Sequence, residues 1–365
     1  MLGTFLLLIV SLVGALGLVG WSRVWVSLGL PSMSPPFADM RVVKAGWLRE
    51  EAGISPRVLD AHDPWNRPMN YPLIWAKFGG LFGFAKENAF LAFTAFWVIL
   101  FWAVCGWVIY RYPNFYTLSF PFSFACLLAV ERGNTDLVIV TPLFLAAYGS
   151  PALAAAAILL GAALKIFPCF AVGALLKSRW IFLLTVCLTG AFILWRIPEV
   201  RELKALTPES GWWSYGASSL SLSLEPKLNL RIPVAVIQAL VAAATLACFL
   251  VLRRKSACWR SSSDAGTERL FMAGAGIYIG TFFFTSSWDY RMVFLLLCLP
   301  WLSGLRSAWI RHLALGSTLL AANQIYLCKI PMDLAFLANL LAKALLFVLL
   351  AGLALNLTVR PQAEK

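Results

Sequence analysis

The sequence predicts an all-α polytopic membrane protein, a bundle of about ten to twelve transmembrane helices with a large first extracytoplasmic loop. Hydrophobic residues make up 61% of the chain and charged residues 13%, whereas soluble proteins contain about 45–50% and about 25%. Apolar runs close to the ~20 residues of a helical span recur along the whole chain. We therefore expect a single integral membrane domain over residues 1–365, with no separate soluble domain.

The spans are expected in apolar segments that follow one another from the N-terminus. They cover residues 2–21, 88–110, 115–130, 137–149, 151–164, 168–177, 180–195, 231–252, 270–285, 292–304, 313–328 and 334–356. The first segment has no basic residues before it and no convincing cleavage site after it, so we expect it to be a retained span. Several segments are short for a full crossing. Pro168 leaves open whether residues 151–177 form one long helix or two short ones, since a proline frees a backbone carbonyl.

The orientation follows from the short connections that are rich in Lys and Arg, which favour the cytoplasmic side. These connections are residues 177–179, 253–269 and 306–311. The two long loops, 22–87 and 196–230, are then extracytoplasmic, together with the turns at 131–136, 286–291 and 329–333. Most of the acidic residues fall on this outer side, so we expect the chemistry there. The expected location is the bacterial inner (plasma) membrane, with the site on the extracytoplasmic side.

Charge and cysteine content restrict the partners. The net charge of +13 favours anionic membrane lipids or a phosphate-bearing ligand. The basic residues are scattered between spans and form no nucleic-acid module, so we expect no nucleic acid partner. The cysteines lie in or beside apolar spans without CxxC spacing or nearby histidines, which argues against a disulfide framework or a zinc site. We expect no metal and no cofactor, and there is no glycine-rich nucleotide loop.

The first loop, residues 22–87, is too long to be a simple connector. Trp47, Trp65 and Trp75 offer flat faces on which a sugar ring could stack, or they form an interfacial aromatic belt. His62 is a candidate second acid or phosphate contact because histidine titrates near neutral pH, and the alternative is a surface histidine without a role. Asp60 and Asp63 are as consistent with a solvated loop edge as with a metal pair.

Short polar segments interrupt the apolar sequence, and ionisable groups at membrane depth are functional candidates. Residues 131–136 carry three charges, with a solvated turn capped at Thr135 or Asp136 as the alternative. Lys165 either faces a ligand beside Pro168 or snorkels to the interface. Residues 286–291 either contribute to a site or hold a local ion pair. Residues 212–215 in the second long loop either shape an acceptor site or anchor the chain at the interface.

Four of these motifs occur in an order that resembles a known family. They are Asp39 in an Asp-x-Arg-Val context, the Tyr71-Pro72 pair, the Gly133-Asn134 turn and the segment from Leu164 to Pro168. Over residues 35–295 the chain resembles glycosyltransferase family 87, in the C superfamily of membrane glycosyltransferases (GT-C). Many members have a second proline at the position of Leu73, a glutamine at the position of Asn134, and a histidine-containing segment at residues 289–291.

The resemblance implies a GT-C-like bundle whose first outer loop carries the catalytic aspartate, which by position is Asp39. It also implies a polyprenyl-phosphate sugar as donor. The expected activity is transfer of a hexose or pentose, with a mannose-like sugar favoured, to a hydroxyl group of a lipid or glycan acceptor.

The residue types fit this chemistry, because sugar transfer from a lipid phosphate needs a base for the acceptor and cations for the leaving phosphate. Asp39 is the expected general base, and a single displacement predicts inversion at the anomeric carbon. The expected donor-phosphate contacts are Arg132, Lys165 and Arg291. The expected substrate contacts are Arg41, His62, Asp63, Trp65, Tyr71, Asn134, Asp136, Asp289 and Tyr290.

Two other functional classes remain as alternatives. In a secondary transporter or lipid flippase, charged residues such as Glu131, Asp136, Lys165 and Asp289 would contact an ion or substrate at broken helices. Such a protein should show a repeat of hydropathy between its halves, which is not evident. A structural assembly partner would leave the ordered motifs unexplained.

Overall fold

The computed structural model describes residues 1–59, 61–207, 214–228, 232–254, 264–284, 287–324 and 332–359. Within these ranges the regular secondary structure is helical, apart from one short pair of strands. Asp60, Trp212, Trp213 and Ser286 lie outside the described residues, so the expectations for these four residues stay predictions.

Among the described residues, four helices are long and apolar enough to cross a membrane. They are α1 (Leu2–Val19), α5 (Glu87–Arg111), α13 (Val234–Arg254) and α18 (Met332–Thr358). A fifth span is possible if α10 (Arg179–Trp195) and α11 (Ile197–Leu206), which meet at an angle of 68°, count as one. The protein is therefore an integral membrane protein with several helical spans. Among the described residues, the number of helices long and apolar enough to cross is thus four or five, which is fewer than the ten to twelve spans expected.

The other expected spans fall on shorter or interrupted helices or, in the case of residues 270–285, on a helix that is long enough but not apolar enough to be a candidate span, because its first turns carry Glu268 and Arg269. The segment 115–130 is divided into α6 (Phe115–Ser119), η2 (Phe120–Phe122) and α7 (Phe124–Arg132), with Pro121 at the break. Residues 151–177 form two short helices, α9 (Pro151–Leu164) and η3 (Phe167–Leu175), because Lys165 between them adopts an extended backbone. The remaining apolar elements are α8 (Thr135–Tyr148), α15 (Ala265–Phe284), η4 (Asp289–Leu297), α16 (Leu299–Ser303) and α17 (Ala308–Ala321).

Both long loops contain regular structure. The first loop folds into α2 (Trp21–Ser27), α3 (Ala38–Glu51), α4 (Ile74–Phe78) and η1 (Gly79–Phe82). The second contributes α11, α12 (Ala217–Leu228) and strand β1 (Ser214–Tyr215), which pairs antiparallel with β2 (Ser287–Trp288). This two-stranded ribbon, β1 with β2, therefore joins the second loop to the start of η4.

A separate small core lies under the first loop and fixes α3 in place. Trp47 and Trp75 are buried in it together with Tyr71 and Phe90. Trp65 remains half-buried. Two of the tryptophans considered as sugar-stacking faces thus serve as packing residues, and they are not exposed at a membrane interface either.

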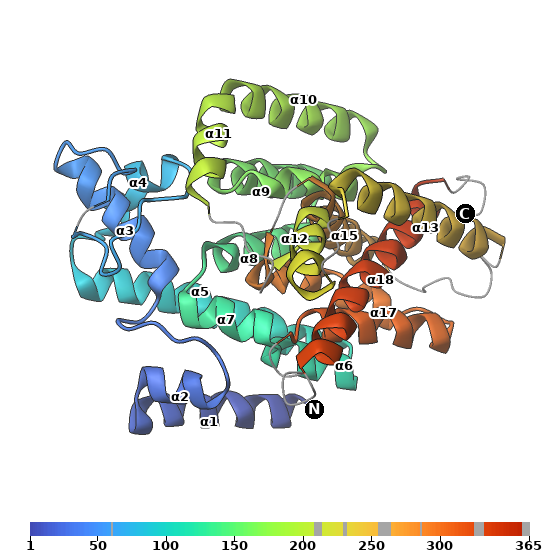
Figure 1. Ribbon diagram of the computed structural model, residues 1–365, viewed down its shortest axis with the longest axis horizontal. Coiled ribbons are helices and arrows are strands. Elements are labelled where there is room, and N and C mark those ends of the chain that lie inside the picture. The colour runs from blue at the N-terminus through green and yellow to red at the C-terminus, as the bar shows by residue number, and fades with distance from the viewer. Residues whose placement is uncertain are drawn as a thin grey trace.

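The first loop and two of the basic connections lie at opposite ends of the helix bundle. α3 and α4 of the first loop lie beyond the left-hand ends of α9 and α10 (Figure 1). At the opposite end, Lys177 Nζ lies 2.7 Å from Glu268 Oε2, and Arg269 donates hydrogen bonds to the carbonyl oxygens of Ala147 and Gly149. Two of the basic connections therefore meet at the end remote from the first loop, as the orientation predicted from sequence requires.

The orientation gives a labelling prediction. A cysteine placed at the exposed Lys204 of α11 should react with an impermeant thiol reagent from outside intact cells. A cysteine at Lys177, whose side chain is 71% exposed at the other end of the bundle, should react only after the membrane is opened. The unsubstituted chain gives the background. The reverse pattern would invert the topology.

Gly133 is a position where the fold requires glycine. Its φ of +56° ends α7 in the left-handed region. A Cβ there would approach Thr94 Cγ2 to 2.6 Å and Phe37 Cβ to 2.9 Å. Gly133→Ala should therefore lower the free energy of unfolding by about 2–5 kcal/mol. Thermal unfolding in detergent measures the change.

Gly53 provides the matched control for this substitution. Its φ is +71°, but no atom lies within 4 Å of the position that an alanine Cβ would take. Gly53→Ala should cost only the left-handed strain, about 1–2 kcal/mol. Equal losses for both variants would show that the contacts with Thr94 and Phe37 do not matter.

Candidate functional site

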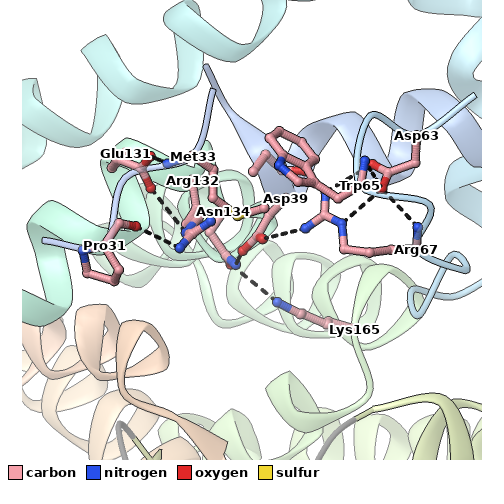
Figure 2. Close-up of polar contacts among 11 residues, drawn as sticks. Pro31, Met33, Asp39, Asp63, Trp65, Arg67, Glu131, Arg132, Asn134 and Lys165 are labelled. Carbon is pink, nitrogen blue, oxygen red and sulfur yellow. Dashed lines mark hydrogen bonds and ion pairs between the residues drawn. The ribbon is translucent and has the colours of Figure 1, made fainter. Parts of the chain in front are cut away.

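The candidate site lies where the first turn of α3, the start of α8 and the break after α9 meet. Asn134 connects these elements (Figure 2). Its Nδ2 donates to Asp39 Oδ2 at 2.5 Å, and its Oδ1 accepts from Lys165 Nζ at 3.3 Å. Asn134 is fully buried, whereas 15% of the Asp39 side chain is exposed. The geometry thus leaves a carboxylate accessible beside a buried amide and a buried ammonium.

The local fold explains why Asn134 occupies this place. Gly133 turns the chain at the end of α7, and Asn134 then caps α8 by accepting a hydrogen bond from Asp136 N at 2.9 Å. The cap is therefore Asn134, not Thr135 or Asp136 as the alternative interpretation held. Thr135 and Asp136 are both fully buried, so a solvated turn is wrong for this segment.

Lys165 is held from several sides. Its Nζ lies 2.5 Å from Asp136 Oδ1, and the rings of Tyr71, Phe167 and Tyr290 have their centroids 5.2, 5.6 and 5.8 Å away. With 8% of its surface exposed, Lys165 does not snorkel to a membrane interface.

Pro168 frees a backbone carbonyl near Lys165, as expected from the sequence. Pro168 cannot donate to the carbonyl of Leu164, and that oxygen accepts a hydrogen bond of 2.9 Å from Trp75 Nε1 instead. The first loop is thereby fastened to the helix break that carries Lys165.

Arg67 is a site residue that the sequence analysis missed. Its Nη1 lies 3.8 Å from Asp39 Oδ1, and its Nη2 donates to Ala38 O at 2.6 Å (Figure 2). Asp63 orients it by accepting from Nε and Nη2 at 3.0 Å each, while the Trp65 ring lies 4.7 Å from its guanidinium carbon. The available signal was the Asp-to-Arg spacing of four residues in a loop rich in tryptophan.

Asp63 and Trp65 thus act on Arg67. Asp63 is 1% exposed and also accepts the backbone N–H groups of Trp65 and Arg67. Its carboxylate is saturated by these donors, so it organises the loop and does not face an open space.

Arg132 is directed to the start of the first loop. Its Nη2 donates to Pro31 O at 2.8 Å, and its Nε lies 3.1 Å from Glu131 Oε2. Glu131 also accepts from Met33 N at 2.8 Å and from Ser32 Oγ at 3.2 Å. The two side chains together fasten residues 31–33, which precede Asp39.

Arg41 and His62, which were also expected in the site, belong to the first loop. Arg41 donates to Pro36 O and to Glu87 Oε1 and stacks over Phe90. His62 is exposed.

The segment after β2 contributes to the site differently from expectation. Asp289 pairs with Lys343 Nζ at 2.9 Å, so the local ion pair with Arg291 is wrong. Arg291 Nη1 donates to Ser287 Oγ at 2.7 Å, and its guanidinium carbon lies 4.1 Å from the centroid of Phe167. Phe167 and Tyr290 both face Lys165, which brings Arg291 to the margin of the site.

Burial raises the pKa of the Tyr71 hydroxyl well above its usual value, and the nearby charge of Asp39 acts in the same direction. The pKa of Tyr290 is raised for the same two reasons. Both phenols therefore remain protonated at neutral pH and can donate hydrogen bonds to an anion.

No protein family, no characterised protein and no solved structure matches the chain. Within the described residues, no group of three or more His, Cys, Asp or Glu side chains could hold a metal ion. The described residues of the site offer the partly exposed carboxylate of Asp39, the cations Lys165 and Arg67, and the phenols of Tyr71 and Tyr290.

The structure separates the roles of Arg67 and Arg132. For the transferase activity expected from the sequence, Arg67→Ala should lower kcat/KM by roughly 10–100-fold, because a charged group next to Asp39 is lost. Arg132→Ala should instead lower the melting temperature, because the buried Glu131 loses its cation. Steady-state kinetics and thermal unfolding of both variants test this. A larger kinetic loss in folded Arg132→Ala would restore Arg132 as the substrate contact.

Proposed function

We propose that the protein is a membrane glycosyltransferase. It transfers a hexose or pentose, with a mannose-like sugar favoured, from a polyprenyl-phosphate donor to a hydroxyl group of a lipid or glycan acceptor. The reaction takes place at the extracytoplasmic face of a bacterial plasma membrane, in a GT-C-like helix bundle. The donor, acceptor and membrane lipids are the partners, and the proposal needs no cofactor.

One observation carries the proposal. Asp39 is the partly exposed carboxylate that Asn134 holds next to buried Lys165, while Arg67 approaches from the other side. A base and cations at one position suit a reaction in which a hydroxyl loses its proton and a phosphate leaves as an anion. The motifs that resemble family 87 supply Asp39, Asn134 and Lys165, so the resemblance and the geometry support the same residues.

The reaction is a single displacement. The acceptor oxygen attacks the anomeric carbon while Asp39 takes the hydroxyl proton, and the bond from that carbon to the phosphate oxygen breaks with its electron pair leaving on polyprenyl phosphate. Attack opposite the leaving group inverts the anomeric configuration.

The developing phosphate charge needs donors on the leaving side. Lys165 and Arg291 fill this role as the sequence analysis expected, and Arg67 replaces Arg132 as the third cation because Arg132 is engaged by Pro31 and Glu131. Arginine forks can bind two phosphate oxygens at once. Tyr71 and Tyr290 add neutral donors beside Lys165.

A second candidate function is a secondary transporter or lipid flippase. The observation that favours it is the buried Lys165–Asp136 pair at the break between α9 and η3, a placement used by ion and substrate sites in transporters. The accessible Asp39 and the folded first loop have no role in that mechanism, so we give preference to the transferase.

Transfer assays with purified protein test the proposal. A panel of radiolabelled polyprenyl-phosphate sugars is incubated with membrane extract as the acceptor source, and extracted products are separated. Transfer from one donor, with release of polyprenyl phosphate in equal amount, supports the proposal. No transfer from any donor, together with sugar-lipid movement across proteoliposomes, would replace it with the transporter.

A further inference from the structure

A second buried polar cluster lies at Lys343, which the proposed reaction does not use directly. Lys343 belongs to α18, an apolar candidate span, and only 1% of its surface is exposed. Its Nζ lies 2.9 Å from Asp289 Oδ1 and donates to Ser214 O at 3.0 Å and Gln324 Oε1 at 3.2 Å. Burying a charge in a membrane span costs free energy unless the charge is paired, so an ionisable group here is a functional candidate.

The partners of Lys343 belong to the segments that support Tyr290 and Arg291. Ser214 is in β1, which pairs with β2, and Asp289 begins η4 directly after β2. Lys343 therefore connects α18 to both sides of the ribbon. A residue distant in sequence thus fixes the chain immediately before two residues at the margin of the site.

The next contacts run from this segment to Lys165. The Tyr290 ring is stacked on Trp288, with an interplanar angle of 1°, and faces Lys165. Arg291 donates to Ser287 and lies over Phe167, which faces Lys165 as well. The contacts of Tyr290 and Arg291 depend on the position of residues 287–291.

We propose that Lys343 is a positioning residue: through its ion pair with Asp289 it holds Tyr290 and Arg291 where they bind the phosphate of the donor. This inference rests on the proposed function for its kinetic consequence. Its structural part, that Lys343 immobilises residues 287–291, stands independently. Removing one member of a buried pair leaves the other charge uncompensated, so the segment should loosen when Lys343 is neutralised.

Hydrogen–deuterium exchange tests the structural part. In Lys343→Met, backbone amides of residues 287–297 should exchange at least about tenfold faster than in the wild type. The matched control is Tyr278→Phe, which removes the hydrogen bond of Tyr278 to the Lys343 carbonyl oxygen and leaves the ion pair intact. It should exchange like the wild type in this segment. If Lys343→Met does not fold, Lys343→Gln removes the charge with a side chain that still donates to Asp289.

A mutant cycle with Arg291 tests the functional part. Lys343→Met and Arg291→Ala should each raise KM for the donor by about tenfold, and the double variant should raise it by clearly less than the product of the two single effects, because Lys343 acts partly through Arg291. A general loss of stability would leave the two effects additive. Additive effects, or wild-type KM in Lys343→Met, would overturn the positioning role.

The two proposals fail in distinguishable ways. If the wild type transfers sugar from no donor, the proposed function has failed, and the exchange experiment still decides whether Lys343 holds residues 287–297. If the wild type is active and this segment exchanges equally in Lys343→Met and Tyr278→Phe, the inference about Lys343 is wrong while the transferase stands.

Discussion

Asp39→Asn is expected to lower kcat by about 10²–10⁴-fold, the usual contribution of a general base. The asparagine oxygen can still accept the hydrogen bond from Asn134 Nδ2, so the local geometry should be kept. What the substitution removes is the ability to take the acceptor proton. Donor binding depends on the cations at the site and should remain within a few-fold of the wild-type value.

Glu51→Gln is the matched control for this substitution. Glu51 is the last residue of the same helix, α3, and its side chain is exposed. The control should keep wild-type kcat and KM. Retained turnover in folded Asp39→Asn would remove Asp39 from the base role, whereas loss of both turnover and donor binding would indicate that Asp39 orders the site instead.

Much of the helical framework could be predicted because apolar composition is a strong local signal. The expected spans at residues 2–21, 88–110 and 231–252 coincide closely with α1, α5 and α13. The breaks were harder, because hydropathy does not report where a backbone leaves the helix. Pro168 left open whether residues 151–177 form one helix or two, and the structure contains the break, whereas the division of residues 115–130 around Pro121 was not anticipated.

The site shows a similar limit. Asp39, Asn134 and Lys165 were selected from motifs far apart in sequence, and the structure brings them into contact. Their catalytic and binding roles stay predictions. The order of the motifs was informative because each motif marks a turn or a break that returns to the same end of the bundle.

Pairings between charged residues could not be predicted, because sequence proximity was a poor guide to them. One of the two interpretations paired Asp289 with its neighbour Arg291, while its actual partner is Lys343, a residue on another helix. Arg67 was missed because its approach to Asp39 depends on the fold of the first loop. Inside a membrane protein, a buried charge is satisfied by whichever opposite charge the helix packing brings close.

Lys165→Met is expected to affect both stability and donor binding. Lys165 is the cation of a buried pair with Asp136: the lysine Nζ donates to Oδ1, and Oδ2 of the same carboxylate has no hydrogen-bond partner among the described residues. Breaking such a pair by removing one member costs about 3–5 kcal/mol. Loss of a charged contact to the donor phosphate should weaken donor binding by roughly 10–100-fold. The single variant alone does not separate these two effects.

The double variant Lys165→Met/Asp136→Asn separates them, because it removes the uncompensated charge together with the lysine. Thermal unfolding should return most of the way to the wild-type value, since a neutral pair avoids the cost of an isolated buried charge. Donor binding, measured with a radiolabelled polyprenyl-phosphate sugar, should stay weak because the cation is still missing. Lys177→Met, at the other end of the bundle, should behave like the wild type in both measurements. Recovery of donor binding together with stability would mean that Lys165 serves only to neutralise Asp136, and the leaving phosphate would then depend on Arg67 and Arg291.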